Sequence, residues 1–157
     1  MAYNREAAVE YARRWAFSRN PNFFDFSKLG GDCTNFASQC IYAGVGVMNY
    51  TPVTGWYYNS LNSRAPAWTG VNELYNFLIN NRGVGPRAVE VPLSEIQIGD
   101  IVQLRFIGKS TFSHCPVVVR RGRGTPGTVL IAAHTNDAYL RPLSTYMYAE
   151  LRPLHIL

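Results

Sequence analysis

The segment from residue 30 to residue 42, GGDCTNFASQCIY, constrains the fold more than any other part of the chain. Two glycines open it, and glycine adopts the positive φ angles of tight turns at little cost. Asp32 follows as the expected N-cap of a helix that ends at Gly44 or Gly46. The apolar face of this helix is made of Phe36, Ala37, Cys40 and Ile41. Cys33 is thus predicted at a helix N-terminus, where the helix dipole favours a thiolate. A small buried cysteine without chemistry is the alternative.

Length and composition predict one globular domain. The 157 residues are 47% hydrophobic and 13% aromatic, which excludes a disordered chain and allows a real core. The three cysteines lack the spacing of a disulfide framework or a zinc site, so we expect no metal and no other cofactor. The N-terminus has no apolar signal segment. We therefore expect either an intracellular protein or a domain of a longer chain that is secreted or acts on the cell wall.

The charge balance favours an anionic partner without identifying it. Fifteen Lys and Arg against ten Asp and Glu give a net charge of +5, which suits cell-wall polymer, nucleic acid or a lipid surface. Three arginines fall in the expected hairpin loop at residues 120–127, most simply a solvated turn. No nucleic-acid-binding motif surrounds them and no stretch is long enough to span a membrane, so we expect neither partner.

The remaining periodicity predicts an α+β domain. We expect helices over residues 4–18 and 69–80, and strands over residues 101–106, 113–119, 129–135 and 146–156. Helices followed by antiparallel strands are typical of the α+β class. The intervening residues 47–67 lack periodicity but are rich in aromatic side chains. This segment is either one wall of a binding groove or a loop that its aromatic side chains anchor in the core.

Two of the three histidines lie on neighbouring predicted strands. His114 begins one strand and His134 ends the next, so both fall near the same end of the expected hairpin. A nucleophilic thiol needs a base, and the base needs a third polar group to orient it. Cys33, His114 and a polar residue among 134–137 meet this need, although each histidine alone is also consistent with a structural role. We expect the other candidates to be structural: Cys40, Cys115 and His155.

Several short motifs, taken together, resemble the putative amidase domain family of Gram-positive bacteria, a branch of the papain-like clan. They are GDCTNFASQ at 31–39, GWYY at 55–58, WT at 68–69, IGD at 98–100, SH at 113–114, AHT at 133–135 and RPLS at 141–144. They follow one another in order along nearly the whole chain. The segments around Asp32-Cys33 and the strand histidines also resemble the NlpC/P60 and CHAP peptidoglycan hydrolases.

The resemblance implies a papain-like α+β fold in which the nucleophile helix packs on a small antiparallel sheet. It implies hydrolysis of amide bonds in cell-wall peptides by Cys33 as nucleophile and His114 as general base. His134 takes the position of the third group, with Asn136 and Asp137 as alternatives. The backbone N–H of Cys33 would bind the oxyanion. Substrate contacts are expected at Asp32, Trp56, Tyr57, Trp68 and Asn136.

One difficulty and two rival functions remain at this stage. The Asp32 carboxylate beside Cys33 opposes ionisation of the thiol, unless it points into the helix as a cap. The first rival is an acyltransferase, in which a thioester at Cys33 passes to an amine or lipid. The second is a binding module for cell-wall or other anionic polymer, without turnover. We expect a monomer whose partner is peptidoglycan or a cell-wall peptide.

Overall fold

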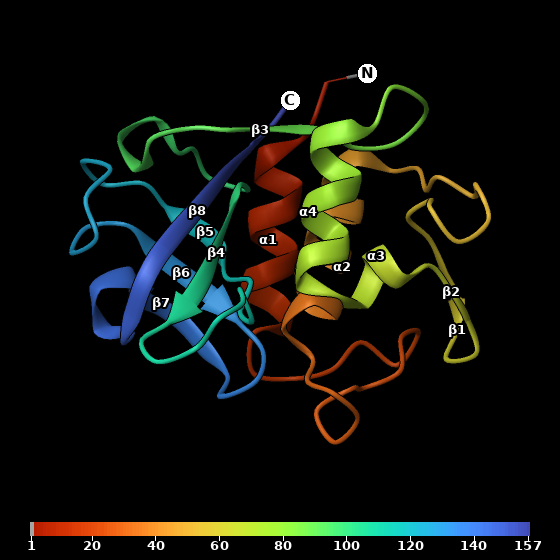
Figure 1. Cartoon of the computed structure of the whole chain (residues 1–157), viewed down its shortest axis with the longest axis horizontal. Helices are drawn as coiled ribbons and strands as arrows, with labels where there is room; N and C mark the ends of the chain where they lie inside the picture. Colours follow the sequence, from red (N-terminus) through yellow and green to blue (C-terminus); the bar gives the residue numbers. More distant parts are fainter. Residues whose placement is uncertain (1) are drawn as a thin grey trace.

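The computed structural model describes residues 2–157 and has an α+β architecture. A group of helices forms the centre of the molecule, and a six-stranded sheet lies against one side of it (Figure 1). A loop and a small two-stranded sheet lie on the other side of α4 (Figure 1). Within residues 2–157, no helix combines the length and the apolar character that crossing a membrane requires.

The first two helices confirm the sequence prediction. Helix α1 spans Arg5–Trp15, and the side chain of Asn4 caps it by accepting a hydrogen bond from the Ala7 N–H at 3.0 Å. Helix α2 spans Cys33–Val45 and ends at Gly46, whose φ angle of 77° lies in the left-handed region. The two helices pack together, and the α2 side chains that face the core are almost all buried.

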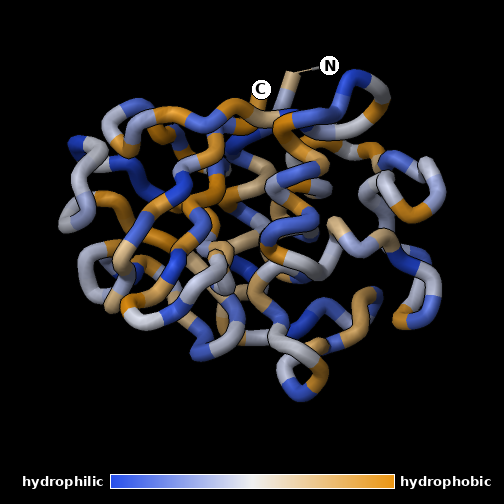
Figure 2. Tube along the Cα trace, in the orientation of Figure 1, coloured by the Kyte–Doolittle hydropathy of each residue, from blue (hydrophilic) through white to orange (hydrophobic). Residues whose placement is uncertain are grey.

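The segment between α2 and the sheet contains more structure than its periodicity predicts. Strands β1, Tyr58–Ser60, and β2, Ser63–Arg64, form a short hairpin. The helix predicted over residues 69–80 is confirmed as α4, Val71–Asn80, and a short helix that was not predicted, α3 at Pro66–Thr69, precedes it. They are separate because the extended backbone of Gly70 interrupts them. Figure 2 shows hydrophobic and hydrophilic residues alternating along α4, as expected for an amphipathic helix with one apolar face.

All strands of the main sheet pair antiparallel in the order β3-β8-β4-β5-β6-β7. They span Ala88–Glu90 (β3), Ile101–Phe106 (β4), Val117–Arg120 (β5), Leu130–Ala133 (β6), Ala138–Pro142 (β7) and Tyr148–Ile156 (β8). Single 3₁₀ turns η1, Leu93–Glu95, and η2, Leu143–Thr145, precede β4 and β8. The predicted central strands are confirmed, whereas β3 and β7 were not predicted because they are short and weakly alternating.

Two predicted strands are shorter than their sequence pattern indicates. Strand β5 begins at Val117 rather than at residue 113, because Pro116 lacks the N–H that a ladder needs. His114 makes only an isolated bridge to Leu104. Strand β6 ends at Ala133, so His134 stands just beyond it. Both histidines therefore lie at strand ends, where their side chains can reach groups outside the sheet.

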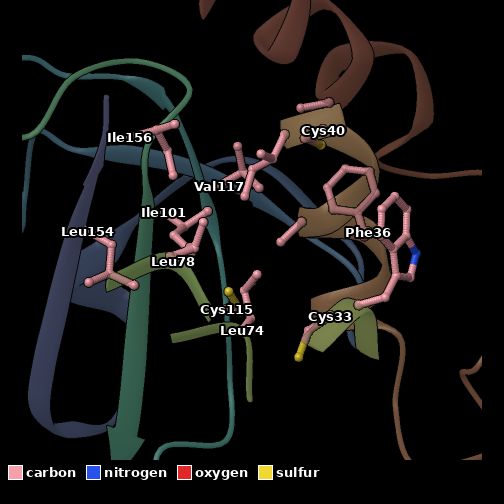
Figure 3. Packing of buried hydrophobic residues seen from close by; sticks show 14 of the residues in the cluster. Cys33, Phe36, Cys40, Leu74, Leu78, Ile101, Cys115, Val117, Leu154 and Ile156 are labelled. Atoms are coloured by element: carbon pink, nitrogen blue, oxygen red, sulfur yellow. The ribbon is translucent and has the colours of Figure 1, made fainter. Parts of the chain in front are cut away.

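The core has two parts, one on each face of the sheet. The larger part lies between the helices and the sheet and contains Cys33, Phe36, Cys40, Cys115 and Val117. Several of these side chains are visible in Figure 3. The smaller part lies on the opposite face and is built from Ile96, Val102, Leu104, Val118, Val129, Ile131, Ala133, Ala138 and Leu143. Cys40 is fully buried, which confirms its predicted core position.

Candidate active site

Cys33 is the first residue of α2, as predicted. The two preceding glycines adopt positive φ angles, 87° at Gly30 and 100° at Gly31, which form the tight turn that delivers the chain to the helix. The Cys33 side chain is 8% exposed. Figure 3 shows it pointing away from the labelled aliphatic side chains at the start of α2. Little of the Cys33 surface is therefore open to a substrate.

The Asp32 side chain does not cap the helix, contrary to the prediction. It is buried and makes no capping hydrogen bond. One oxygen, Oδ1, accepts hydrogen bonds from the Phe26 N–H at 2.8 Å and from Asn35 Nδ2 at 2.9 Å. The other, Oδ2, lies 2.5 Å from Nδ1 of His134. The carboxylate is therefore saturated by protein groups, and it is placed to hold the turn before Cys33 rather than to contact substrate.

The surroundings of Cys33 oppose the thiolate that its helix position was predicted to favour. Burial raises the pKa of Cys33, and the charge of Asp32 raises it further. Hydrogen bonds from the Thr34 hydroxyl and from the backbone of Cys115 and Thr34 act in the opposite direction, but they do not reverse the shift. Sγ also lies 3.8 Å from the carbonyl oxygen of Ser113. The resting thiol therefore needs a base to become a nucleophile.

His134 is placed behind Cys33, and both of its ring nitrogens have partners. Nδ1 faces the Asp32 carboxylate, while Nε2 lies 2.8 Å from the carbonyl oxygen of Trp15 and 3.3 Å from Arg19 Nη1. The ring also stacks on Phe36, with 4.0 Å between the ring centroids. With both nitrogens engaged, His134 ties the end of α1 to the start of α2. It has no nitrogen left to orient a second histidine.

His114 has a different environment. Its Nε2 lies 3.4 Å from the hydroxyl of Tyr146, and no other hydrogen-bond partner of its ring occurs within residues 2–157. The ring packs beside Phe106 and Tyr146. Burial lowers the pKa of His114 to about 4, and the nearby charge of Arg141 lowers it further. His114 is therefore a neutral imidazole at pH 7, which is the form that accepts a proton.

The two histidines are near the same end of the β5–β6 hairpin, but they do not contact each other. Cys115 packs in the same core cluster as Cys33, on the helix-facing side of the sheet. The His114 ring, one residue earlier, instead meets Phe106 and Tyr146, which pack against the cluster on the opposite face. The predicted contact from His134 to His114 is thus absent in the described part of the chain. His114 remains close to Cys33 along the backbone, because Ser113 faces Sγ.

The two alternative third residues lie in the exposed β6–β7 turn. Thr135 and Asn136 have φ angles of 61° and 58°, as in the tight turns of hairpins. Asn136 is exposed, so its predicted contact with substrate stays a prediction. Asp137 forms a two-fold hydrogen bond to Arg19, at 2.9 and 3.0 Å. Thr135 Oγ1 accepts a hydrogen bond from the Asp32 N–H at 3.0 Å, so this turn also supports the segment before Cys33.

Two of the aromatic residues that we predicted to contact substrate are part of the core. Trp56 and Trp68 are both 0% exposed, and Trp68 Nε1 donates to Asn35 Oδ1 at 2.9 Å. The indole rings are large apolar surfaces that gain more from burial than from a surface role. Tyr57 is half-buried beside Tyr50, and its contact with substrate remains a prediction. His155, predicted to be structural, pairs with the buried Asp100 at 2.9 Å.

Sequence reasoning missed Tyr146, the residue that contacts the His114 ring. Tyr146 follows the 3₁₀ turn η2, and the Arg141 guanidinium lies 3.6 Å from its ring centroid. Arg141 in turn donates from Nε to Thr145 Oγ1 at 2.7 Å. Burial raises the pKa of Tyr146, which keeps its hydroxyl protonated. A sequence signal near this residue exists, because Arg141 is the first residue of the RPLS motif, to which no role was assigned.

Comparison with known proteins identifies the family of the chain. Residues 2–157 match a family model described as a putative amidase domain. The uncharacterized protein YhbB of Bacillus subtilis strain 168 is 34% identical over 142 residues, 88% of this chain and 43% of that protein. A second uncharacterized protein of the same strain, YjcM, is 25% identical over 107 residues, 68% of this chain and 24% of that protein. No solved structure matches the chain.

The chain thus spans less than half the length of these two relatives. The family match, by contrast, covers all of the described residues, including the α2 start, both strand-end histidines and the RPLS segment. On this evidence the chain belongs to the putative amidase domain family.

Proposed function

We propose that the protein is a cysteine amidase or peptidase of the papain-like clan, with Cys33 as the nucleophile. One observation carries the proposal: Sγ of Cys33, at the N-terminus of α2, faces the backbone of Ser113 immediately before the neutral His114. The family match to an amidase domain supports the reaction type. The helix α2 packed beside the sheet supports the comparison with papain-like enzymes.

In the proposed mechanism, His114 accepts the proton of the Cys33 thiol. We propose that His114 donates from Nε2–H to the Tyr146 hydroxyl, 3.4 Å away, which leaves the lone pair on Nδ1 for this transfer. The charge of Cys33 acts on Tyr146, which contacts the His114 ring, so the two proposed groups lie within electrostatic range across the end of the sheet. Catalytic hydrogen bonds often tighten only when substrate binds, and we expect the contact between His114 and Cys33 to form at that stage. The role that the resemblance gave to His134 passes in this proposal to Tyr146.

The thiolate then attacks the amide carbonyl carbon, and the C–N bond breaks. His114 returns its proton to the leaving amine, and water hydrolyses the thioester at Cys33 with His114 again as base. Backbone groups of Thr34 and Cys115 hydrogen-bond to the Cys33 sulfur, and in this mechanism they stabilise its negative charge after the proton has left. The backbone N–H of Cys33, at the helix start, is the proposed oxyanion donor.

We propose bacterial cell-wall peptide as the substrate class. The protein would then act outside the cell. We further propose that the chain is one domain of a longer protein. The motif resemblance supports this, as do the net charge of +5, which suits an anionic polymer, and the greater length of the two relatives. No cofactor is required by the proposed chemistry.

The test is digestion of purified peptidoglycan by the wild-type protein and by Cys33→Ala, with mass spectrometry of the released fragments. New amine and carboxyl ends that appear only with the wild type would establish the hydrolase and identify the bond. Rapid alkylation of Cys33 near neutral pH without release from walls of several chemical types would favour the acyltransferase. No release together with an unreactive Cys33 would favour a binding module and refute the enzyme.

A further inference from the structure

A second concave surface lies away from Cys33, between α4 and the loop that follows α2. It has a volume of about 670 Å³, within the range of small-ligand sites. Figure 1 shows this loop on the side of α4 that is opposite to the main sheet. None of Cys33, His114 and Tyr146 lines it. The surface is thus separate from the candidate active site.

Most of the polar side chains that line this pocket are uncharged, and three of them have no hydrogen-bond partner in the described residues. The side chains of Thr51, Thr54 and Asn76 line it, and none of them makes a hydrogen bond within residues 2–157. Hydroxyl and carboxamide groups both donate and accept hydrogen bonds. Three further asparagines of the lining already donate to backbone carbonyl oxygens: Asn49, Asn80 and Asn81. The charged side chains are one acidic residue, Glu73, and one basic residue, Arg82, so the pocket carries no excess charge. This composition does not favour phosphate or a polyanion.

Apolar side chains form the rest of the wall. Val53, Pro66 and Phe77 contribute them from the loop, α3 and α4. Val53 is 69% exposed and has a φ angle of 65°, a conformation that is strained for a β-branched residue. Such strain persists where the surrounding structure fixes it, and it is concentrated at functional sites. The strain here holds an isopropyl group at the rim of the pocket.

The loop that forms one wall of the pocket is held in place at several points. Asn49 and Trp56 exchange two backbone hydrogen bonds of 2.8 Å, and Trp56 is fully buried. A Cβ atom at Gly55 would lie 2.3 Å from the Asn49 carbonyl oxygen, so only glycine fits. Asn49 and Asn81 both donate to the Val84 carbonyl oxygen, at 3.0 and 3.1 Å. A preformed site binds without the entropic cost of ordering its walls.

We propose that this pocket binds a neutral oligosaccharide. A pyranose ring combines a rim of hydroxyl groups with an apolar face of C–H groups, which matches hydroxyl and amide side chains around Val53 and Phe77. Extended peptides, by contrast, are often bound along an exposed strand edge, and no strand residue lines this pocket. If the proposed function holds, the pocket would hold the glycan of the cell wall while its peptide lies at Cys33.

The experiment is an NMR titration of the wild-type protein with two uncharged probes, tri-N-acetylchitotriose and cellotriose. We expect binding of at least one probe with a dissociation constant of about 1 mM or lower. The backbone signals that shift should come from the loop around Val53 and from α4 around Phe77. Binding of neither probe would overturn the proposal, and so would shifts confined to the surroundings of Cys33.

Matched variants locate the site. Asn76→Ala, on an exposed face of α4, should weaken binding about tenfold without loss of fold, because alanine is a good helix former. The control is Asn59→Ala, an exposed asparagine of β1 that does not line the pocket, and it should bind as the wild type does. Equal binding by all three proteins would refute the site.

Two further measurements separate the possible outcomes. Displacement of the saccharide by an uncharged alanine-rich peptide would assign the pocket to peptide and contradict the proposal. Cys33→Ala should bind saccharide as well as the wild type does. Saccharide binding without any hydrolysis of peptidoglycan would leave this proposal standing and refute only the proposed enzyme.

Discussion

His134 and His114 are both buried at strand ends, yet their surroundings differ in one respect that decides their roles. Both nitrogens of His134 are engaged, by Asp32 on one side and by Trp15 and Arg19 on the other. His114 has one polar partner, the hydroxyl of Tyr146, and keeps a second nitrogen free within the described residues. A base needs an unoccupied lone pair, whereas a structural histidine gains from having none. From this comparison we propose that His114 acts in the chemistry and that His134 is structural.

The largest expected effect is on turnover, at His114. Glutamine in its place retains bulk and hydrogen bonding but cannot act as a base. We expect His114→Gln to lower kcat/KM for the amide substrate by about 10²–10⁴-fold. The thermal unfolding midpoint shows whether the variant is folded. Activity within tenfold of the wild type in a folded protein would remove His114 from the mechanism.

At His134 we expect a loss of stability instead. His134→Ala leaves Oδ2 of the buried Asp32 carboxylate without its hydrogen-bond partner, which should lower the free energy of unfolding by about 3–5 kcal/mol. Urea denaturation measures this loss. The matched test is a double-mutant cycle with Asp32→Asn, in which the two losses should not add, because the pair acts as a unit. If the two losses of stability simply add, the pairing of Asp32 with His134 is contradicted. If the His134 variant folds normally but is inactive, His134 has a catalytic role.

The pH dependence of stability should report the burial of His114. The folded protein holds the pKa of His114 near 4, below its ordinary value of 6.5. The unfolded chain therefore takes up a proton first as the pH falls, and stability declines between pH 6.5 and pH 4. The contribution of this one group is on the order of 3 kcal/mol. In urea titrations at a series of pH values, His114→Gln should lack this part of the stability loss. If the stability of the variant instead falls with pH in parallel with the wild type, the burial of a neutral His114 ring is contradicted.

The smallest expected effect is at Tyr146. Tyr146→Phe removes only the hydroxyl that fixes the His114 ring, so we expect a loss in kcat of about tenfold and little change in KM. The acid limb of the pH–rate profile should also move, which a purely structural role would not cause. The control is Tyr148→Phe, because the Tyr148 hydroxyl makes no hydrogen bond in residues 2–157. Equal behaviour of the two variants would leave His114 without an orienting partner.

The sequence by itself determined those features that depend on neighbouring residues. Asn4 caps α1, Gly46 ends α2, and Cys33 follows a glycine turn at a helix start, all as the local pattern predicts. Strand β4 likewise follows from its alternation. These features could be predicted because helix caps, turns and periodicity are interactions between residues close in sequence.

Only the tertiary structure decided which groups surround the candidate nucleophile. Asp32 and His134 are 102 residues apart in sequence, and His114 and Tyr146 are 32 apart. Whether such side chains meet depends on strand register, since a shift of one residue moves every side chain to the other face of a sheet. Pro116 ends the pairing of β5 early, and it is Cys115 rather than His114 that joins Cys33 in the helix-facing core. The aromatic pattern likewise left open whether Trp56 and Trp68 would be buried, because burial depends on what the rest of the chain packs against them.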